Sequence, residues 1–147
     1  MSQLTLTVVA YTEKHSEINF VRSQVYEIEQ GINPDRVFDG KDELAEHILA
    51  YLDNQPVGTA RMRCLSEQST SIEKLAVLST ARRQGIGKKI MEKSLEIAAQ
   101  KNVEELVINA QEYIKGLYQQ LGFEQEGERF MAAGNPHALI KMRKRLG

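Results

Sequence analysis

The stretch "TARRQGIGKKI", residues 80–90, decides the fold because it joins a strand-like segment to a helical one through a basic, glycine-rich turn. Before it, "SIEKLAVL" (71–78) has the pattern of a strand, and after it Ile86, Ile90 and Ile97 mark one face of a helix of about four turns. A helix that begins directly after such a turn leaves backbone N–H groups unpaired at the positive end of its dipole, which suits a phosphate. A plain surface turn with solvated arginines explains the same letters about equally well.

The rest of the chain alternates strand-like and helical patterns without a repeat or a linker that would divide it. Strand-like patterns mark 4–11, 47–53, 56–65 and 103–110, helical spacing marks 16–31 and 113–122, and "ERFMAA" with "HALIKMR" forms a last hairpin around "GNP". Ser16 can cap the first of these helices and Gly31 can end it. We therefore expect one α/β domain over residues 1–147, with a mixed sheet and helices packed over it.

Composition limits what the turn can serve. Nineteen basic and twenty acidic residues leave a formal charge of -1, which gives no global field to attract nucleic acid or an anionic membrane. Cys64 is the single cysteine, and no apolar run follows a basic head at the start of the chain, so the expected location is the reducing cytoplasm. Any anion site in this protein must be local.

Two common phosphate loops do not fit the turn. The mononucleotide pattern GxxxxGK[ST] requires glycine where Arg82 stands and a hydroxyl where Lys89 stands, and the dinucleotide pattern GxGxxG fails at Ile90. An ATP-dependent kinase and an NAD-dependent reductase are therefore disfavoured.

The turn instead resembles the [Q/R]-x-x-G-x-[G/A] signature of the GCN5-related N-acetyltransferases, with Arg82, Gly85 and Gly87 at its defining positions. The surrounding "IEKLAVL", "ELVINAQ" and "LYQQLGF" are similar to the family's segments in the same order, and "VRSQVYEIEQGI" with "FDGKD" resembles a small bacterial subgroup. The resemblance implies a mostly antiparallel mixed sheet with helices on both faces, acetyl-CoA as co-substrate and no metal.

The resemblance also assigns the cofactor site. Backbone amides from Gln84 to Lys88 would hold the pyrophosphate, and the pantetheine arm would pair like an added strand with the backbone of Leu75 and Val77. Asn109 either bonds the pantetheine or caps its own strand. The complete expected set is Leu75, Ala76, Val77, Arg82, Arg83, Gln84, Gly85, Ile86, Gly87, Lys88 and Asn109.

Two catalytic residues follow from the same resemblance. Tyr118 matches the family's usual general acid, although spacing alone would make it a core aromatic residue. Glu73 is the leading general base, with a pKa that burial could raise towards neutrality, and an ion pair with Arg61 or Arg63 is the equally weighted alternative. The expected reaction is direct transfer of the acetyl group to an amine in a ternary complex.

The acceptor side is the least specified by the sequence. Arg22, Glu29, Gln30, Asp39 and Asp42 would border it by the subgroup resemblance, and His137 joins them through "GNPHALIKM". A polar cluster that locks the first helix to the following loop explains the first five nearly as well.

The nature of the acceptor and two other classes of function stay open. The acceptor is a small molecule or a peptide, and the protein is a monomer or a homodimer. A non-catalytic acyl-CoA-binding sensor and a protein-interaction module are the alternative functions.

Overall fold

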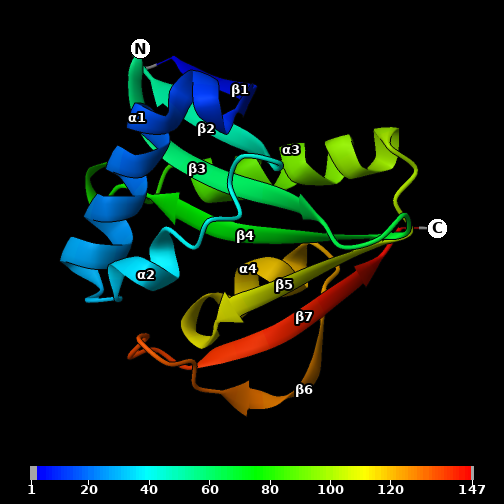
Figure 1. Cartoon of the computed structure of the whole chain (residues 1–147). Helices are drawn as coiled ribbons and strands as arrows, with labels where there is room; N and C mark the ends of the chain where they lie inside the picture. The colour runs from blue at the N-terminus through cyan, green and yellow to red at the C-terminus, as the bar shows by residue number, and fades with distance from the viewer. Residues whose placement is uncertain (1–2, 147) are drawn as a thin grey trace.

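The computed structural model describes residues 3–146, so residues 1–2 and 147 of the expected domain lie outside the described part of the chain. A seven-stranded sheet in the order β1-β2-β3-β4-β5-β7-β6 runs through it (Figure 1). The neighbouring strands pair antiparallel except β4 and β5, which pair parallel. The strands are β1 Leu4–Ala10, β2 Glu46–Leu52, β3 Gln55–Cys64, β4 Ser69–Val77, β5 Glu105–Gln111, β6 Glu124–Phe130 and β7 Leu139–Arg145.

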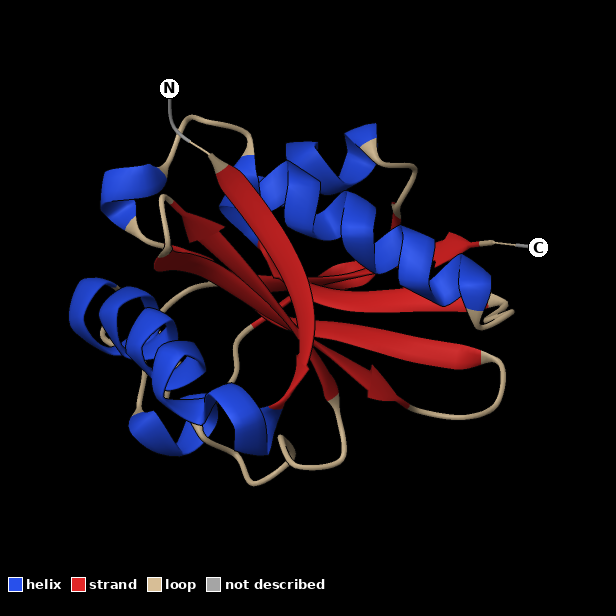
Figure 2. Cartoon of the chain, turned by 90° about the horizontal axis from the view of Figure 1, so that it is seen from above, coloured by secondary structure: helices blue, strands red, loops and turns tan. Residues whose placement is uncertain are grey.

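Helices cover both faces of this twisted sheet (Figure 2), as the family resemblance implies. The helices α1 Tyr11–Arg22 and α2 Pro34–Val37, with the π-helix Ser23–Glu29 between them, lie on one face, while α3 Ile86–Gln100 and α4 Lys115–Gln120 lie on the other. Single 3-10 turns, Ser79–Ala81 and Glu112–Ile114, precede α3 and α4.

Each face has its own apolar contacts. Ile90 and Met91 of α3 are fully buried in the larger core together with residues of the central strands, whereas Val21 and Val25 pack against Ala76 on the opposite face. The stripe expected after the basic turn therefore does cover the sheet.

The parallel pair β4–β5 is short. It runs from Ser69 opposite Glu105 to Ile72 opposite Ile108, although both strands continue beyond these residues. At that point Lys74 has a left-handed backbone with φ 56°, and the register of β4 against β3 shifts between Thr59 and Arg61. This bulge bends β4 away from β5 and opens the sheet between them (Figure 1).

The structure corrects three boundaries. The first helix begins at Tyr11, so Ser16 is not its cap; instead the Glu13 carboxylate accepts a hydrogen bond from the Ala10 amide, a local contact that the apolar spacing does not report. The turn of the β2–β3 hairpin is Asp53 and Asn54, both with positive φ. In the last hairpin, residues 131–138 form a longer connection than the expected "GNP".

Candidate active site

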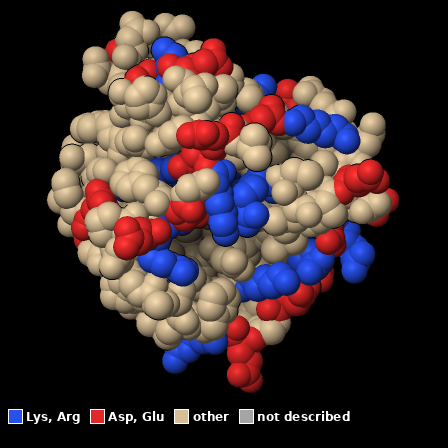
Figure 3. Space-filling view, viewed as in Figure 1, with Lys and Arg blue, Asp and Glu red and all other residues tan. Residues whose placement is uncertain are grey.

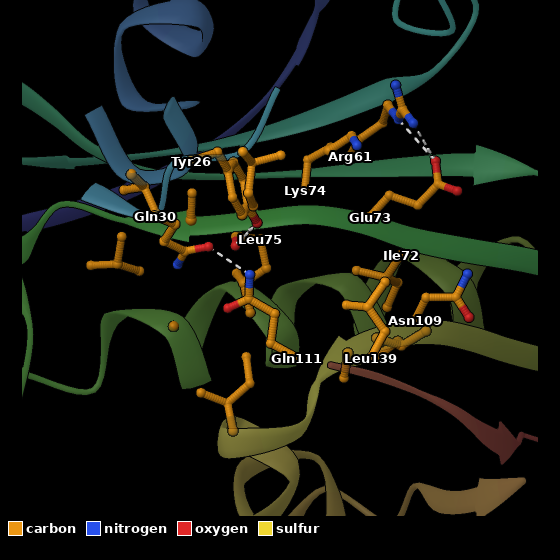
Figure 4. Close-up of a pocket in the computed structure, with 18 of the residues that line it drawn as sticks. Tyr26, Gln30, Arg61, Ile72, Glu73, Lys74, Leu75, Asn109, Gln111 and Leu139 are labelled. Atoms are coloured by element: carbon orange, nitrogen blue, oxygen red, sulfur yellow. Dashed lines mark hydrogen bonds and ion pairs between the residues drawn. The ribbon is translucent and has the colours of Figure 1, made fainter. Parts of the chain in front are cut away.

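A cavity of about 750 Å³ lies where β4 and β5 separate. The side chains that line it come from both strands, from the start of α3, from α4 and from the segment after α1 (Figure 4). In the view of Figure 3 the surface is hollowed at this place, with basic side chains gathered at its upper rim. The cavity therefore joins segments that are far apart in the sequence.

The expected cofactor residues meet at this cavity with one exception. The set that lines it is Leu75, Ala76, Val77, Arg82, Arg83, Gly85, Ile86, Gly87, Lys88 and Asn109, while Gln84 does not line it. Of the expected catalytic and acceptor residues, Tyr118, Glu73 and Gln30 line the cavity, whereas Arg22, Glu29 and His137 do not.

The basic turn forms the N-terminus of α3 at one end of the cavity. Gly85 is the residue before the helix and has φ 74°, a conformation that favours glycine, and no side chain caps the helix there. A methyl group on Gly85 would meet no heavy atom within 4 Å, whereas one on Gly87 would touch the Val77 side chain at an ordinary 3.8 Å. The space in front of the first amides of α3 is thus open, and glycine at position 85 keeps it open.

The backbone carbonyl oxygens of Leu75 and Val77, which were expected to pair with pantetheine, already accept hydrogen bonds from side chains. The Tyr26 hydroxyl donates to the Leu75 carbonyl oxygen, and Arg82 Nε donates to the Val77 carbonyl oxygen at 3.0 Å. Burial, with a smaller contribution from the nearby Tyr118, raises the pKa of the Tyr26 phenol, so it remains a donor. The edge of β4 is therefore accessible to an added strand only after these two donors move.

Glu29 and Gln30 connect the first helical segment to the rest of the cavity. Glu29 forms a two-point ion pair with Arg82, with Oε1 at 2.5 Å from Nη2, so its partner is the basic turn. Gln30 Oε1 accepts from Gln111 Nε2, at the end of β5, at 2.5 Å (Figure 4). The Gln30 carbonyl oxygen lies 3.2 Å from His137 Nε2. Gln111 was missed by the sequence analysis; its position at the end of a strand was the available signal.

Tyr118 lies at the inner wall of the cavity. It is only 2% exposed, packs edge-on against Phe123 with ring centroids 6.1 Å apart, and contributes to the cavity lining. Burial, followed by the neighbouring Tyr113, raises the pKa of its phenol. Tyr118 thus combines both sequence interpretations, a core aromatic residue and a protonated hydroxyl at the cavity.

Glu73 is the centre of an ion-pair cluster rather than a carboxylate with a raised pKa. It accepts five hydrogen bonds, from Arg61 Nε and Nη2, Arg63 Nε and Nη2, and the Ser71 hydroxyl, at 2.6–3.0 Å. Burial alone would raise its pKa, but the bonds from Arg63 and Arg61 outweigh burial and lower the pKa to about 2. The expectation of a raised pKa is wrong, and the ion pair weighed against it is present.

The same cluster continues to the loop after α2. Arg61 Nη1 lies 2.7 Å from Asp39 and 3.1 Å from Asp42, and fully buried Arg22 bonds Asp42 at 2.9 Å. Buried Arg22 therefore fastens α1 to the loop, as the structural alternative for these residues proposed.

Lys74 is a cavity residue that the sequence analysis missed. Strict alternation would place it on the face opposite Glu73, but the left-handed bulge brings both side chains to the side of Arg61 (Figure 4). Its ammonium donates to the Arg36 carbonyl oxygen at 2.5 Å. Burial lowers the pKa of Lys74 to about 8, with Asp39 acting in the opposite direction.

Within residues 3–146, no helix is long and apolar enough to cross a membrane. The same part of the chain holds no group of three or more His, Cys, Asp or Glu side chains arranged for a metal ion.

The open sheet, the glycine turn at a helix start and the buried tyrosine together define an acyltransferase fold of the kind that the sequence resembles. The chain belongs to the acetyltransferase (GNAT) domain family, whose model matches residues 18–146. Members of the family use acetyl-CoA, so membership supports an acyltransferase activity for this chain.

Individual proteins agree with this membership. The chain is 35% identical to the uncharacterized protein YyaT of Bacillus subtilis over 123 residues, 82% of either chain. It shares its fold with an acyl-CoA N-acyltransferase from Pseudomonas aeruginosa, at a TM-score of 0.85, 24% identity and coverage of 97% and 99%. A GNAT family acetyltransferase from Elizabethkingia anophelis, solved with acetyl-CoA bound, aligns at a TM-score of 0.73, 19% identity and coverage of 97% and 98%.

Proposed function

We propose that this protein is an N-acetyltransferase that moves the acetyl group of acetyl-CoA to a primary amine by direct attack in a ternary complex. The observation that carries the proposal is the separation of β4 from β5 with an uncapped helix N-terminus at one end and Tyr118 in its wall. These residues fit coenzyme A: the open space at Gly85 suits a phosphate, and the edge of β4 beyond Ile72, which no described strand pairs, suits an amide-bearing arm once the Tyr26 and Arg82 donors move.

The residues of this chain would divide the binding between them. The backbone amides of Ile86, Gly87 and Lys88 at the start of α3 would hold the pyrophosphate, while Arg83 and Lys88 add charge around it. Arg82 already has Glu29 as a partner, so it serves the phosphates only by exchanging that ion pair. Leu75 and Val77 would accept the amides of the pantetheine arm once Tyr26 and Arg82 release their carbonyls.

The chemistry requires a bond from the amine nitrogen to the acetyl carbon, cleavage of the carbon–sulfur bond, loss of an amine proton and a proton for the thiolate. The Tyr118 phenol, kept protonated by its raised pKa, would donate the proton to sulfur. Glu73 has its carboxylate fully engaged by two guanidinium groups and a pKa of about 2, so we do not assign it the removal of the amine proton. The amine proton would pass to solvent water, and the Tyr118 phenolate would regain its proton from solvent after the thiol leaves.

Calorimetric titration with acetyl-CoA, with ATP and NADH as controls, tests the binding, and a screen of amines that follows the release of free thiol tests the reaction. Selective binding of acetyl-CoA together with amine-dependent thiol release supports the proposal. Binding without thiol release points to an acyl-CoA sensor. No binding of any of the three compounds would leave the turn as a simple helix start and favour an interaction module.

A further inference from the structure

The part of the cavity lining that comes from α2, β3, β4 and the loop after α2, outside the basic turn of α3, carries more positive than negative side chains. We call these lining residues the acceptor-side group: the cations Arg36, Lys41, Arg61, Arg63 and Lys74, and the carboxylates Asp35, Asp39 and Glu73. Five cations against three carboxylates leave a surplus of two positive charges on this wall. Basic side chains accordingly gather at the rim of the hollow in Figure 3.

Two half-buried carboxylates of this group are already bound. Glu73 accepts from both Arg61 and Arg63, and Asp39 holds Arg61 through both of its oxygens at 2.7 and 2.9 Å. A cationic acceptor, such as a polyamine, would have to displace a guanidinium to reach either of them. The wall is therefore unsuited to recognition of additional positive charge on the acceptor.

Of the five cations, Arg61 and Arg63 are held by carboxylates, whereas Arg36, Lys41 and Lys74 form no ion pair within the described part of the chain. Arg36 and Lys41 are exposed to solvent, so Lys74 is the half-buried one of these three. Among the described residues, no carboxylate oxygen lies within the 4.0 Å ion-pair distance of its ammonium, which instead donates to the Arg36 carbonyl oxygen. A half-buried ammonium without a counter-ion is unfavourable, and so is the left-handed backbone that turns Lys74 to this side. The ammonium lies at the wall of the cavity, where an incoming anion would offset the cost of leaving it without a counter-ion.

We infer that the acceptor is an amine that also carries a carboxylate, and that the Lys74 ammonium at the bulge of β4 is the group that binds this carboxylate. The inference rests on the proposed function and narrows its acceptor. A lysine–carboxylate hydrogen bond at a cavity wall is charge-assisted, so it is stronger than a neutral one. A site built around it discriminates against the corresponding amide, which would leave the ammonium unpaired.

The first test measures binding without requiring the true acceptor. The protein, saturated with coenzyme A, is titrated with butyrate and with butylammonium, and the backbone amide resonances of Glu73, Lys74 and Leu75 are followed by NMR. We expect butyrate to bind and butylammonium not to. Lys74→Met should weaken butyrate binding at least tenfold, while Lys74→Arg, which keeps the charge, should stay within threefold of the native protein.

The variants are chosen to keep the fold. Methionine at position 74 has the same branching as lysine, so the left-handed backbone costs it no more, and a thermal melt checks that the protein is intact. Lys93→Met is the matched control, because Lys93 lies on α3 and pairs with Glu96 outside the cavity lining. Butyrate affinity in this control should equal that of the native protein.

The second test is kinetic and uses amino acids paired with their amides as acceptors. The native protein should have a kcat/KM at least tenfold higher for the acid of a pair, and Lys74→Met should bring the ratio close to one, mainly through KM. Stronger binding of butylammonium, no binding of butyrate, or an unchanged Lys74→Met would overturn the inference. Failure of coenzyme A to bind, checked in the same samples, would instead count against the proposed function.

Discussion

Two glycines with the same backbone strain allow the phosphate site to be tested separately from stability. Gly85 has φ 74° and Gly127 in β6 has φ 81°, and a methyl group at either position would meet no heavy atom within 4 Å. Alanine therefore costs each protein about the same, roughly 1–2 kcal/mol of unfolding free energy, from the left-handed backbone alone. For a chain of this size each kcal/mol lowers Tm by about 2–4 °C.

The two variants should differ only in binding. The methyl group of Gly85→Ala would occupy open space beside a residue that lines the cavity. Loss of one charge-assisted hydrogen bond to a phosphate costs about 1.5–3 kcal/mol. We therefore expect the acetyl-CoA Kd of Gly85→Ala to rise roughly 10- to 150-fold, because 1.4 kcal/mol corresponds to a factor of ten. Gly127→Ala should keep the native Kd.

Thermal melts and calorimetric titrations on both variants decide the matter. If both variants lose the same amount of Tm and only Gly85→Ala loses affinity for acetyl-CoA, the result would support a pyrophosphate site at the turn before α3. Unchanged affinity in a folded Gly85→Ala protein would refute the assignment of the pyrophosphate to this turn, however well the fold agrees with the family.

Three further outcomes are expected. Tyr118→Phe should lower kcat at least tenfold in thiol-release assays with little change in acetyl-CoA Kd, and an unchanged kcat would remove Tyr118 from the role of general acid. Tyr26→Phe should free the Leu75 carbonyl and tighten acetyl-CoA binding about two- to tenfold in the same titration, whereas weaker binding would mean that the hydroxyl helps to hold the cofactor. Because the pKa of Glu73 is lowered from 4.5 to about 2 in the folded state, its stabilising contribution is complete above pH 4.5 and is lost as the pH falls towards 2. Denaturant unfolding across this range should show a shallower acid loss for Glu73→Gln, and identical slopes would contradict the pairing.

The sequence was informative where function depends on local pattern. The strand before residue 80, the turn with Gly85 and the stripe of Ile86, Ile90 and Ile97 are contiguous, so spacing alone located the start of α3 correctly. Most of the residues that the family signature assigned to the cofactor do line the cavity.

What the sequence could not supply depends on partners distant along the chain. The pKa of Glu73 is set by two arginines of the neighbouring strand, and either one or both could have paired with it. The left-handed backbone of the bulge that turns Lys74 towards the cavity is formed by lysine itself, so the sequence has no glycine there to indicate it. The bond between Gln30 and Gln111 joins residues 81 positions apart, a separation that no periodicity can detect.

The short parallel pairing of β4 with β5 also has a consequence for how the chain folds. The strands β1 to β4 form one antiparallel unit and β5 to β7 another, each made of strands that follow one another in the order of the chain. Within residues 3–146, the strands of the two units pair with each other only from Ser69 to Ile72, beside the bonds that the Glu104 and Glu105 amides donate to the Gln68 carbonyl oxygen. The helix α3 lies between the two units in the chain. This seam is expected to close late in folding, after each half has formed its local contacts. A ligand that contacts both units along the seam would stabilise their association. Amide hydrogen exchange at Ile72 and Ile108 should therefore slow when the ligand binds, before any chemistry occurs.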